Sequence, residues 1–351
     1  MKKDKKSFLT GNEVVIKAAL AAGADSFYGY PITPATEIMD GWAEVYSKNS
    51  KLNFLQAEDE MSAGFLMIGA ALTGKKAFTA TTGVGNVLMQ DPLSMAEAME
   101  LPTVAVIGQR GGPSTGSVIY SQQEVNLTCY GGNGEGYRVV YSPSNLQELY
   151  DYTIKAFNTA WKYLIPTFVL TDGYLLKTRS ELNLYQPKAN VTSKPLILKK
   201  ANRNPNKESD YVNLVNTYAI EEECYEANIK LLNKFKKISP EIEESYSYNL
   251  NRQTKKLIIA HGLIASAAEE AINIIGKNKK VGLFVPKTLR PFPQKDLLKQ
   301  LGKIKQIYIY ESAANQLDRL VKEAIYGSRI PIKHFGYPAL GIEAETIAKL
   351  I

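Results

Sequence analysis

The stretch "QAEDEMSAGFLMIGAALTGKKAFTATTGVGNVLMQD" (residues 56–91) contains the alternation that decides the fold. Three carboxylates precede a run rich in Ala, Gly and Met, which predicts a helix over residues 60–74. The next apolar run, residues 76–82, is short and rich in Thr, which predicts a strand. A glycine-containing loop follows. A helix that leads into a buried strand with such a loop at its carboxyl end is typical of a parallel α/β sheet.

The same alternation continues on both sides of this stretch. Residues 10–23 begin with Thr10 and Glu13 at capping-box spacing and end on Gly23, which predicts a complete helix. Further strands are predicted at residues 26–30, 52–58, 102–110 and 166–173, and further helices at 36–48, 85–101 and 145–164. Unbroken apolar strands that alternate with helices predict a parallel sheet with helices on both faces. We assign residues 1–180 to this first domain.

The remainder of the chain changes in composition and then returns to the α/β pattern. Residues 181–253 are rich in Lys, Asn and Pro, so we expect a linker or arm with one helix over 211–238. Strands are predicted at 255–262, 280–288 and 306–312, and helices at 266–275 and 294–302. We therefore expect a second, smaller α/β domain over residues 254–351.

Composition limits the class of protein. The chain has 351 residues, of which 45% are hydrophobic and 22% charged, enough for two buried cores. No apolar stretch approaches the ~20 residues that a membrane span requires, so we expect a cytoplasmic protein without membrane contact. Cys129 and Cys224 are the only cysteines. An iron–sulfur cluster requires about four thiolates, so any such cluster belongs to another chain. The net charge of +7 comes without interleaved aromatic residues, and we expect no nucleic-acid binding.

The carboxylates of "QAEDE" have two interpretations. Glu58, Asp59 and Glu60 complement the positive end of a helix dipole if they serve structure alone. The alternative is that one of them points into an apolar pocket and exchanges a proton with a bound cofactor. Glu60 is the best placed of the three for this role, because it begins the stripe of small and Met side chains that packs on the sheet.

Two other strand ends carry candidate binding residues. In "GQRGGPSTG", Arg110 either extends its charge into solvent or holds a carboxylate with both arms of its guanidinium. In "GYPITPATE" (residues 29–37), Pro31 and Pro34 fix the backbone on either side of Thr33, which is either an ordinary turn or a preordered site. Neither the "GQRGGPSTG" loop nor the "TATTGVGNVLM" loop has the spacing of a P-loop or of a dinucleotide-binding fingerprint.

Together these segments resemble the alpha subunit of 2-oxoacid:ferredoxin oxidoreductases, most closely the branched-chain 2-oxoacid type. The resemblance covers residues 29–37, 56–91 and 100–116, and extends to "VGLFVPKTLRPFP" (281–293) and "IYESAANQL" (309–317). It implies a pyrimidine-type thiamine diphosphate-binding domain followed by a smaller domain similar to the C-terminal domain of transketolase. It also implies oxidative decarboxylation of a 2-oxoacid to acyl-CoA and CO₂, with reduction of ferredoxin.

The resemblance implies a role for particular residues. Glu60 matches the glutamate that hydrogen-bonds the aminopyrimidine ring, and Thr33 and Arg110 match residues that face the substrate carboxylate. Further positions implied to line the site are Ser114 and Thr115 beside the substrate, and Ile32, Thr82, Gly83 and Met89 beside the cofactor. A beta subunit is implied to carry the diphosphate and Mg²⁺ site. Gamma and ferredoxin-like subunits are implied to carry iron–sulfur clusters and to act with ferredoxin and coenzyme A.

The chain departs from the family pattern at a few positions. Thr82 stands where relatives often have Pro before the glycine, and Ala313 and Ala314 replace polar residues of the C-terminal motif. These changes put contacts of the second domain in doubt. "TDGYLL" resembles a magnesium motif, but Thr171 replaces its first glycine, and its partner Asn202 falls in the Lys-rich segment.

Two other classes of function are open at this point. One is a transketolase-like thiamine diphosphate enzyme that works without ferredoxin. The other is a scaffold subunit that has kept the fold and lost the chemistry. The sequence does not fix which 2-oxoacid is used.

Overall fold

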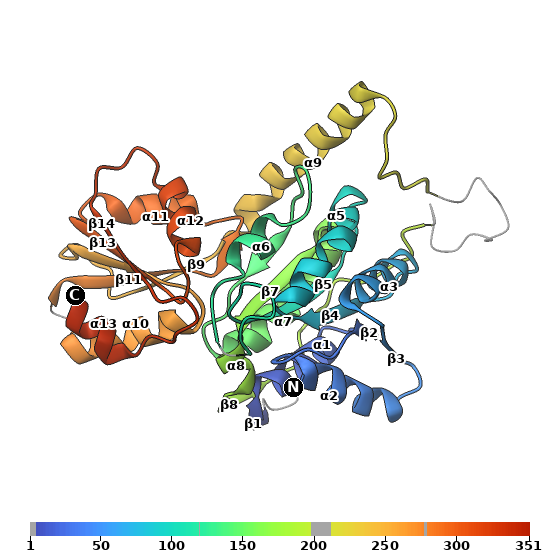
Figure 1. Cartoon of the computed structure of the whole chain (residues 1–351), viewed down its shortest axis with the longest axis horizontal. Helices are drawn as coiled ribbons and strands as arrows, with labels where there is room; N and C mark the ends of the chain where they lie inside the picture. Colours follow the sequence, from blue (N-terminus) through green and yellow to red (C-terminus); the bar gives the residue numbers. More distant parts are fainter. Residues whose placement is uncertain (1–4, 119, 198–211, 277–278) are drawn as a thin grey trace.

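The computed structural model describes residues 5–118, 120–197, 212–276 and 279–351. These residues form two lobes, each with its own central sheet (Figure 1). The first lobe has a seven-stranded sheet with the order β12 (Thr288–Arg290), β6 (Val139–Tyr141), β7 (Thr167–Asp172), β5 (Val104–Gln109), β4 (Ala77–Thr81), β2 (Ser26–Gly29) and β3 (Asn53–Gln56). All neighbouring strands are parallel except β12, which pairs antiparallel with β6.

Helices cover both faces of this sheet, as the sequence predicts. Along β5, Val104 and Val106 join one core, and Ala105 and Ile107 join the other, which follows from the two-residue period of a strand. The first core contains residues of α1 (Gly11–Ala21), α2 (Thr36–Ser47), α7 (Leu146–Tyr163) and α8 (Gly173–Lys177). The second contains residues of α3 (Glu60–Leu72), α5 (Gln90–Ala98) and α6 (Val125–Tyr130).

The second lobe is a five-stranded sheet with its own helices. Its strand order is β14 (Ile332–Gly336), β13 (Gln306–Glu311), β10 (Lys256–Ile259), β11 (Val281–Pro286) and β9 (Ser245–Tyr248). Its helices are α10 (Gly262–Ile275), α11 (Gln294–Leu301), α12 (Gln316–Ala324) and α13 (Ala344–Leu350). β9 alone is antiparallel to its neighbour. The predicted α/β pattern of the second domain is confirmed.

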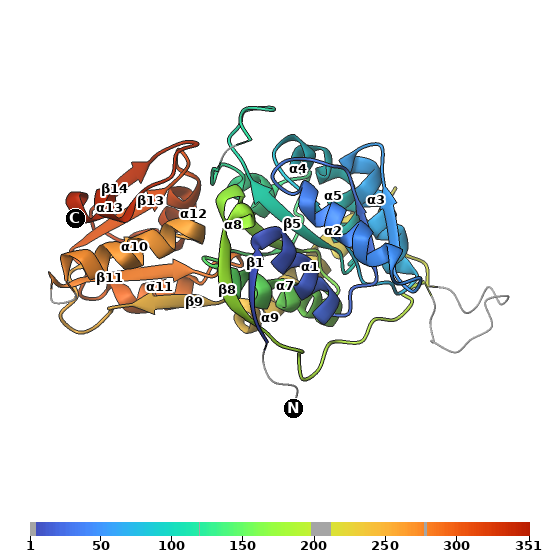
Figure 2. The same cartoon turned by 90° about the horizontal axis from the view of Figure 1, so that it is seen from below.

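The two lobes are connected by more than a linker. β12 lies in the sequence of the second lobe but forms the edge of the first sheet. Leu289 belongs to the same core as Ile107 of the first sheet and Ile309 of the second. Figure 2 shows the lobes side by side with β9 leading out of the region between them. The lobes therefore share one continuous apolar core.

The capping box at the start of α1 was predicted from residues that are close together in the sequence. The Thr10 hydroxyl accepts a hydrogen bond from the Glu13 N–H, and the Glu13 carboxylate accepts one from the Thr10 N–H, so the predicted capping box is confirmed. β1 (Lys5–Thr10), which precedes it, was not predicted, and it pairs antiparallel with β8 (Arg179–Leu184). β8 crosses residue 180, and the domain boundaries at 180 and 253 stay predictions.

Two predicted helices are wrong in their bounds. The helix expected over 211–238 is α9 (Glu221–Ile242), and residues 212–220 are not helical. Three glutamates fill its first turn, where they complement the helix dipole. The helix expected over 85–101 is two helices, α4 (Val84–Leu88) and α5, which meet at Met89. Pro92 lies in the first turn of α5, where a missing N–H costs nothing.

Candidate functional site

The carboxyl ends of β2, β3, β4 and β5 bring the predicted site residues to one edge of the first sheet. Asp59 caps α3, and its side chain accepts a hydrogen bond from the Ser62 N–H at 2.7 Å. Glu58 is exposed. Glu60 is only 4% exposed, although it is a carboxylate in the first turn of a helix. The three neighbouring carboxylates thus have separate roles, and Glu60 is the one that points inward.

Glu60 occupies a space that exists because residue 85 is a glycine. A Cβ at Gly85 would lie 2.3 Å from Glu60 Oε1 and 2.1 Å from Thr81 Oγ1. Neither of these two buried oxygens has a hydrogen-bond partner of good geometry among the described residues. Burial is the main cause that raises the pKa of the Glu60 carboxyl, and the nearby Asp59 charge raises it further. The Glu60 carboxyl thus keeps one buried oxygen that could accept a further hydrogen bond.

Arg110 lies beside the same loop. It is 5% exposed, and its Nη1 donates to the backbone carbonyl of Thr33 at 2.9 Å. Its Nε is buried without a hydrogen-bond partner among the described residues. A Cβ at Gly83 would lie 2.8 Å from that Nε, and Gly83 has a φ of +54°, a region that favours glycine. Gly83 therefore allows the backbone to approach the guanidinium.

The other predicted residues occupy different environments. Thr33 is exposed, and its carbonyl contacts Arg110. The remaining positions are half-buried Ile32, buried Thr82, and the exposed Ser114 and Thr115 of the loop after β5. Met89 is fully buried in the core shared by the lobes. Thus Glu60, Thr82, Gly83, Arg110 and the Thr33 backbone lie together, whereas Met89 belongs to the apolar core.

Glu124 is a buried residue of this site that the sequence did not reveal. Its Oε1 accepts hydrogen bonds from the backbone N–H groups of Gly83 and Arg110, at 2.9 and 3.0 Å, and from the Thr82 hydroxyl at 3.4 Å. Its Oε2 accepts one from Asn86 Nδ2 at 3.0 Å. Burial raises the pKa of the Glu124 carboxyl, and these hydrogen bonds oppose the shift. Since every neighbouring group donates, the site is built for the ionised form.

Asp172, in the magnesium-like motif, has a structural role. Its Oδ1 accepts the Leu175 N–H at 2.9 Å and so caps α8, and burial raises its pKa to about 7. Asn202, its supposed partner, lies outside the described residues. Among the residues that are described, no group of three or more His, Cys, Asp or Glu side chains could hold a metal ion. Nor is any helix in these ranges long and apolar enough to cross a membrane.

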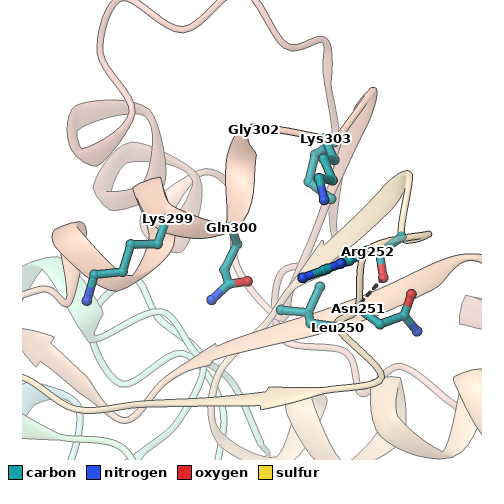
Figure 3. A pocket seen from close by; sticks show the side chains of 9 residues that line it. Leu250, Asn251, Arg252, Lys299, Gln300, Gly302 and Lys303 are labelled. Carbon is teal, nitrogen blue, oxygen red and sulfur yellow. Dashed lines mark hydrogen bonds between the residues drawn. The ribbon is translucent and has the colours of Figure 1, made fainter.

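A basic hollow of about 370 Å³ lies elsewhere, in the second lobe (Figure 3). Arg252, Lys299 and Lys303 extend around it and are exposed. The Asn251 N–H donates to Thr254 Oγ1 at 2.9 Å and so orders one wall. The hollow lies at the amino ends of β10 and β13, whereas open α/β sheets bind ligands at the carboxyl ends of their strands. We assign it no function.

Comparison with known proteins identifies the family of the chain. Residues 17–247 match the family described as pyruvate flavodoxin/ferredoxin oxidoreductase, thiamine diphosphate-binding. The chain belongs to this family. Residues 254–343 match pyruvate:ferredoxin oxidoreductase core domain II. The chain is thus an alpha-type subunit of a 2-oxoacid:ferredoxin oxidoreductase, which confirms the resemblance and the fold class predicted from the sequence.

Two relatives of this oxidoreductase subunit carry different substrate names. It is 32% identical to the 2-oxoglutarate synthase subunit KorA of Methanocaldococcus jannaschii, over 91% of this chain and 93% of the relative. It is 34% identical to the ketoisovalerate oxidoreductase subunit VorB of Methanothermobacter thermautotrophicus, over 83% of this chain and 82% of that one.

Solved structures share the fold of the subunit. A 2-oxoglutarate:ferredoxin oxidoreductase from Magnetococcus marinus, with 2-oxoglutarate, coenzyme A and succinyl-CoA bound, superposes with a TM-score of 0.87 at 24% identity. All of this chain is covered, and it spans 65% of that chain. A split-gene transketolase, an inactive β4 tetramer, matches with a TM-score of 0.60 at 12% identity over 97% of this chain and 96% of its own. The likeness to transketolase is one of fold.

The space at Gly85 gives a testable prediction. Gly85→Ala is expected to lower the free energy of unfolding by about 1–3 kcal/mol, because the added methyl group overlaps two buried oxygens. Gly69→Ala is the control: a Cβ there has nothing within 4 Å, and the better helix propensity of Ala stabilises by about 0.5–1 kcal/mol. Denaturant unfolding of both variants measures the difference. Equal stability of the two would mean that Glu60 does not need the glycine.

Proposed function

We propose that this subunit holds the aminopyrimidine ring of thiamine diphosphate with Glu60 and the carboxylate of a 2-oxoacid with Arg110. The observation that carries the proposal is a pair of buried polar atoms at one edge of the sheet, Glu60 Oε1 and Arg110 Nε. Neither has a hydrogen-bond partner within the described part of the chain. Buried polar groups are otherwise almost always paired, so an unpaired acceptor and an unpaired donor support a ligand between them.

Glu60 fits the cofactor in chemistry as well as in position. When bound, thiamine diphosphate supplies the carbon nucleophile that attacks the carbonyl of the 2-oxoacid. Glu60 is buried, so its carboxyl can exchange a proton with the ring at a site shielded from water, and burial raises its pKa above the ordinary value of a carboxyl. We include Thr82 and Gly83, on the loop after β4, as further cofactor contacts. We include Ile32 and Met89 as further cofactor contacts.

Arg110 fits a substrate carboxylate. A guanidinium forms paired hydrogen bonds with a carboxylate, and this interaction is strong when water is excluded. The bond from Nη1 to the Thr33 carbonyl fixes the plane of the guanidinium before the substrate arrives. We include Thr33, Ser114 and Thr115 as further substrate contacts, because their hydroxyl groups can orient the substrate.

The partner subunits follow from what this chain lacks and from what it exposes. Among the described residues, neither a metal cluster nor a set of thiolates for an iron–sulfur cluster is present: Cys129 is buried and Cys224 lies on α9. We propose that a beta subunit supplies the diphosphate and Mg²⁺ site. Gamma and ferredoxin-like subunits would carry the clusters and act with coenzyme A and ferredoxin. Such an assembly works in the cytoplasm.

An apolar surface beside Glu60 is suited to the beta subunit. Four large side chains are exposed on α3 and α4: Met61, Phe65, Val87 and Leu88. These two helices contact each other, and Glu60 meets Gly85 at their amino-terminal turns. Exposed apolar side chains gathered at one site are typical of protein interfaces. The pocket would thus be completed by the subunit that covers it.

Purification with native partners tests the function directly. The assembled enzyme is expected to reduce a low-potential acceptor in the presence of a 2-oxoacid and coenzyme A, whereas the isolated chain is not.

In the assembled enzyme, Glu60→Gln is expected to slow hydrogen exchange at the thiazolium C2 carbon about a hundredfold or more, measured by NMR. The exposed Glu58→Gln is the control. Exchange at the normal rate in Glu60→Gln would remove Glu60 from this role.

Arg110→Lys tests the substrate site. Lys keeps the charge but loses the planar fork, so the KM for the 2-oxoacid is expected to rise about tenfold or more. Arg252→Lys in the exposed hollow of the second lobe is the matched control. Steady-state kinetics with several 2-oxoacids measures both variants and also identifies the preferred substrate. A lower melting temperature with an unchanged KM would make Arg110 a structural residue.

Val87→Asp tests the subunit interface. Val87 is 57% exposed, and a charge there is expected to weaken assembly with the beta subunit by about tenfold or more, because the carboxylate would have to be buried unpaired. Tyr326→Asp is the control, since Tyr326 is 93% exposed and lies in the second lobe. Analytical ultracentrifugation of mixed subunits measures both. Assembly that is weakened equally, or in Tyr326→Asp alone, would place the interface elsewhere.

A further inference from the structure

A chain of buried polar side chains extends from Glu124 to Glu97 near the carboxyl end of α5. Asn86 Nδ2 donates to Glu124 Oε2, and Gln90 Nε2 donates to Asn86 Oδ1 at 2.9 Å. Arg138 Nη1 donates to Gln90 Oε1 at 2.9 Å, and Arg138 Nε donates to Glu97. All five residues are buried. The chain connects the site to a buried ion pair that neither the sequence nor the proposed chemistry explains.

The two ends of this chain fix the direction of every hydrogen bond in it. A guanidinium only donates, so the Gln90 amide must turn its oxygen toward Arg138 and its NH₂ group toward Asn86. The Asn86 amide must then turn its oxygen toward Gln90 and its NH₂ group toward Glu124. An ionised carboxylate only accepts, so Glu124 ends the chain without conflict. Asn86 Nδ2 also donates to Thr128 Oγ1 at 3.1 Å, which is compatible with this orientation.

Glu124 connects this chain of hydrogen bonds to the two elements of the proposed site, the loop after β4 and the end of β5. Its other oxygen receives the N–H groups of Gly83, the residue that faces Arg110 Nε, and of Arg110 itself. The loop after β4 and the end of β5 are thus held by one carboxylate. Without it, two buried N–H groups would lose their acceptor, which is costly.

We propose that Glu124 is a positioning residue for 2-oxoacid binding, held in place by the directed chain Arg138–Gln90–Asn86 and acting through the backbone of Gly83 and Arg110. This inference rests on the proposed role of Arg110. Glu124 does not contact the substrate. It sets the position from which the guanidinium meets the substrate carboxylate.

Because every hydrogen bond in the chain has a fixed direction, the chain can be tested by moving the carboxylate from residue 124 to residue 86. In Glu124→Gln, the NH₂ group of the new amide faces the NH₂ group of Asn86, so two donors meet. If the Asn86 amide turns around, its NH₂ group faces that of Gln90. If Gln90 also turns, its NH₂ group faces Arg138, which only donates. In the double variant Glu124→Gln/Asn86→Asp, the carboxylate lies at residue 86. It accepts from residue 124, from Gln90 and from the Thr128 hydroxyl, so each donor has an acceptor again. Both variants keep an oxygen for the Gly83 and Arg110 N–H groups.

The assembled enzyme is compared with these variants. Glu124→Gln is expected to raise the KM for the 2-oxoacid about tenfold with a smaller change in kcat, and the double variant to restore it to within about threefold. Binding of oxamate, an unreactive 2-oxoacid analogue, measured by calorimetry, is expected to change by the same factors. Glu100→Gln is the control. Glu100 is a half-buried carboxylate that accepts hydrogen bonds from the Lys230 and Lys234 ammonium groups of α9, so its variant should lose thermal stability and keep its KM.

Each outcome decides between the proposals. Arg110→Lys is measured in parallel: an unchanged KM there refutes the substrate role of Arg110, and with it the basis of this inference. A raised KM in Arg110→Lys with a normal KM in Glu124→Gln refutes the role of Glu124 alone. If Glu124→Gln does not assemble, the double variant decides. Assembly with near-normal KM supports the directed chain, and failure to assemble, or a KM that stays raised, overturns it.

Discussion

The site depends on how two strand ends are held together without regular secondary structure. β4 and β5 are parallel neighbours whose last paired residues are Thr81 and Ile107, and beyond β5 Arg110 makes an isolated antiparallel bridge with Tyr120. Backbone N–H groups that are removed from water need other acceptors. The Glu124 carboxylate does so for Gly83 and Arg110 at once. The Glu124 carboxylate therefore takes the place of a further pair of sheet hydrogen bonds and holds the Gly83 loop beside Arg110.

The same edge shows how unpaired polar atoms can be kept buried. Leaving Glu60 Oε1 and Arg110 Nε without partners costs free energy, and the surrounding packing must supply it. Glycine at positions 83 and 85 brings backbone against both side chains, so that neither can turn away to solvent. Unpaired buried polar atoms do not stabilise a fold. When a fold keeps them at the carboxyl ends of parallel strands, this is typical of a binding site.

The sequence predicted the features whose signal is local. That Glu60 points inward could be found because it comes shortly after a strand and begins an apolar helix, and the capping box at Thr10 because its two partners are three residues apart. Glu124 could not be found, since its partners Gly83 and Arg110 lie 41 and 14 residues away. The pairing of β12 with β6 likewise depends on a long-range contact. Glu124 lies in a polar segment without periodicity, and no residue near it in the chain indicates that it is buried.

The second lobe explains how that polar segment is fixed. Gln122 exchanges hydrogen bonds with Ser312, at 3.0 Å in each direction, and its Nε2 donates to the His261 carbonyl at 2.8 Å. Burial lowers the pKa of His261 to about 3, so its ring stays neutral beside the Ser142 hydroxyl.

The Asn126 N–H donates to Gln316 of the same lobe. The alanines at 313 and 314 leave these contacts intact, because backbone groups and Gln316 make them. Residues 122–126 are thus held by the second lobe on one side, and through Glu124 they hold Gly83 and Arg110 on the other. The smaller lobe is connected to the proposed substrate site through the hydrogen bonds of residues 122–126, so its attachment to the first sheet by β12 is a condition for the geometry of Arg110.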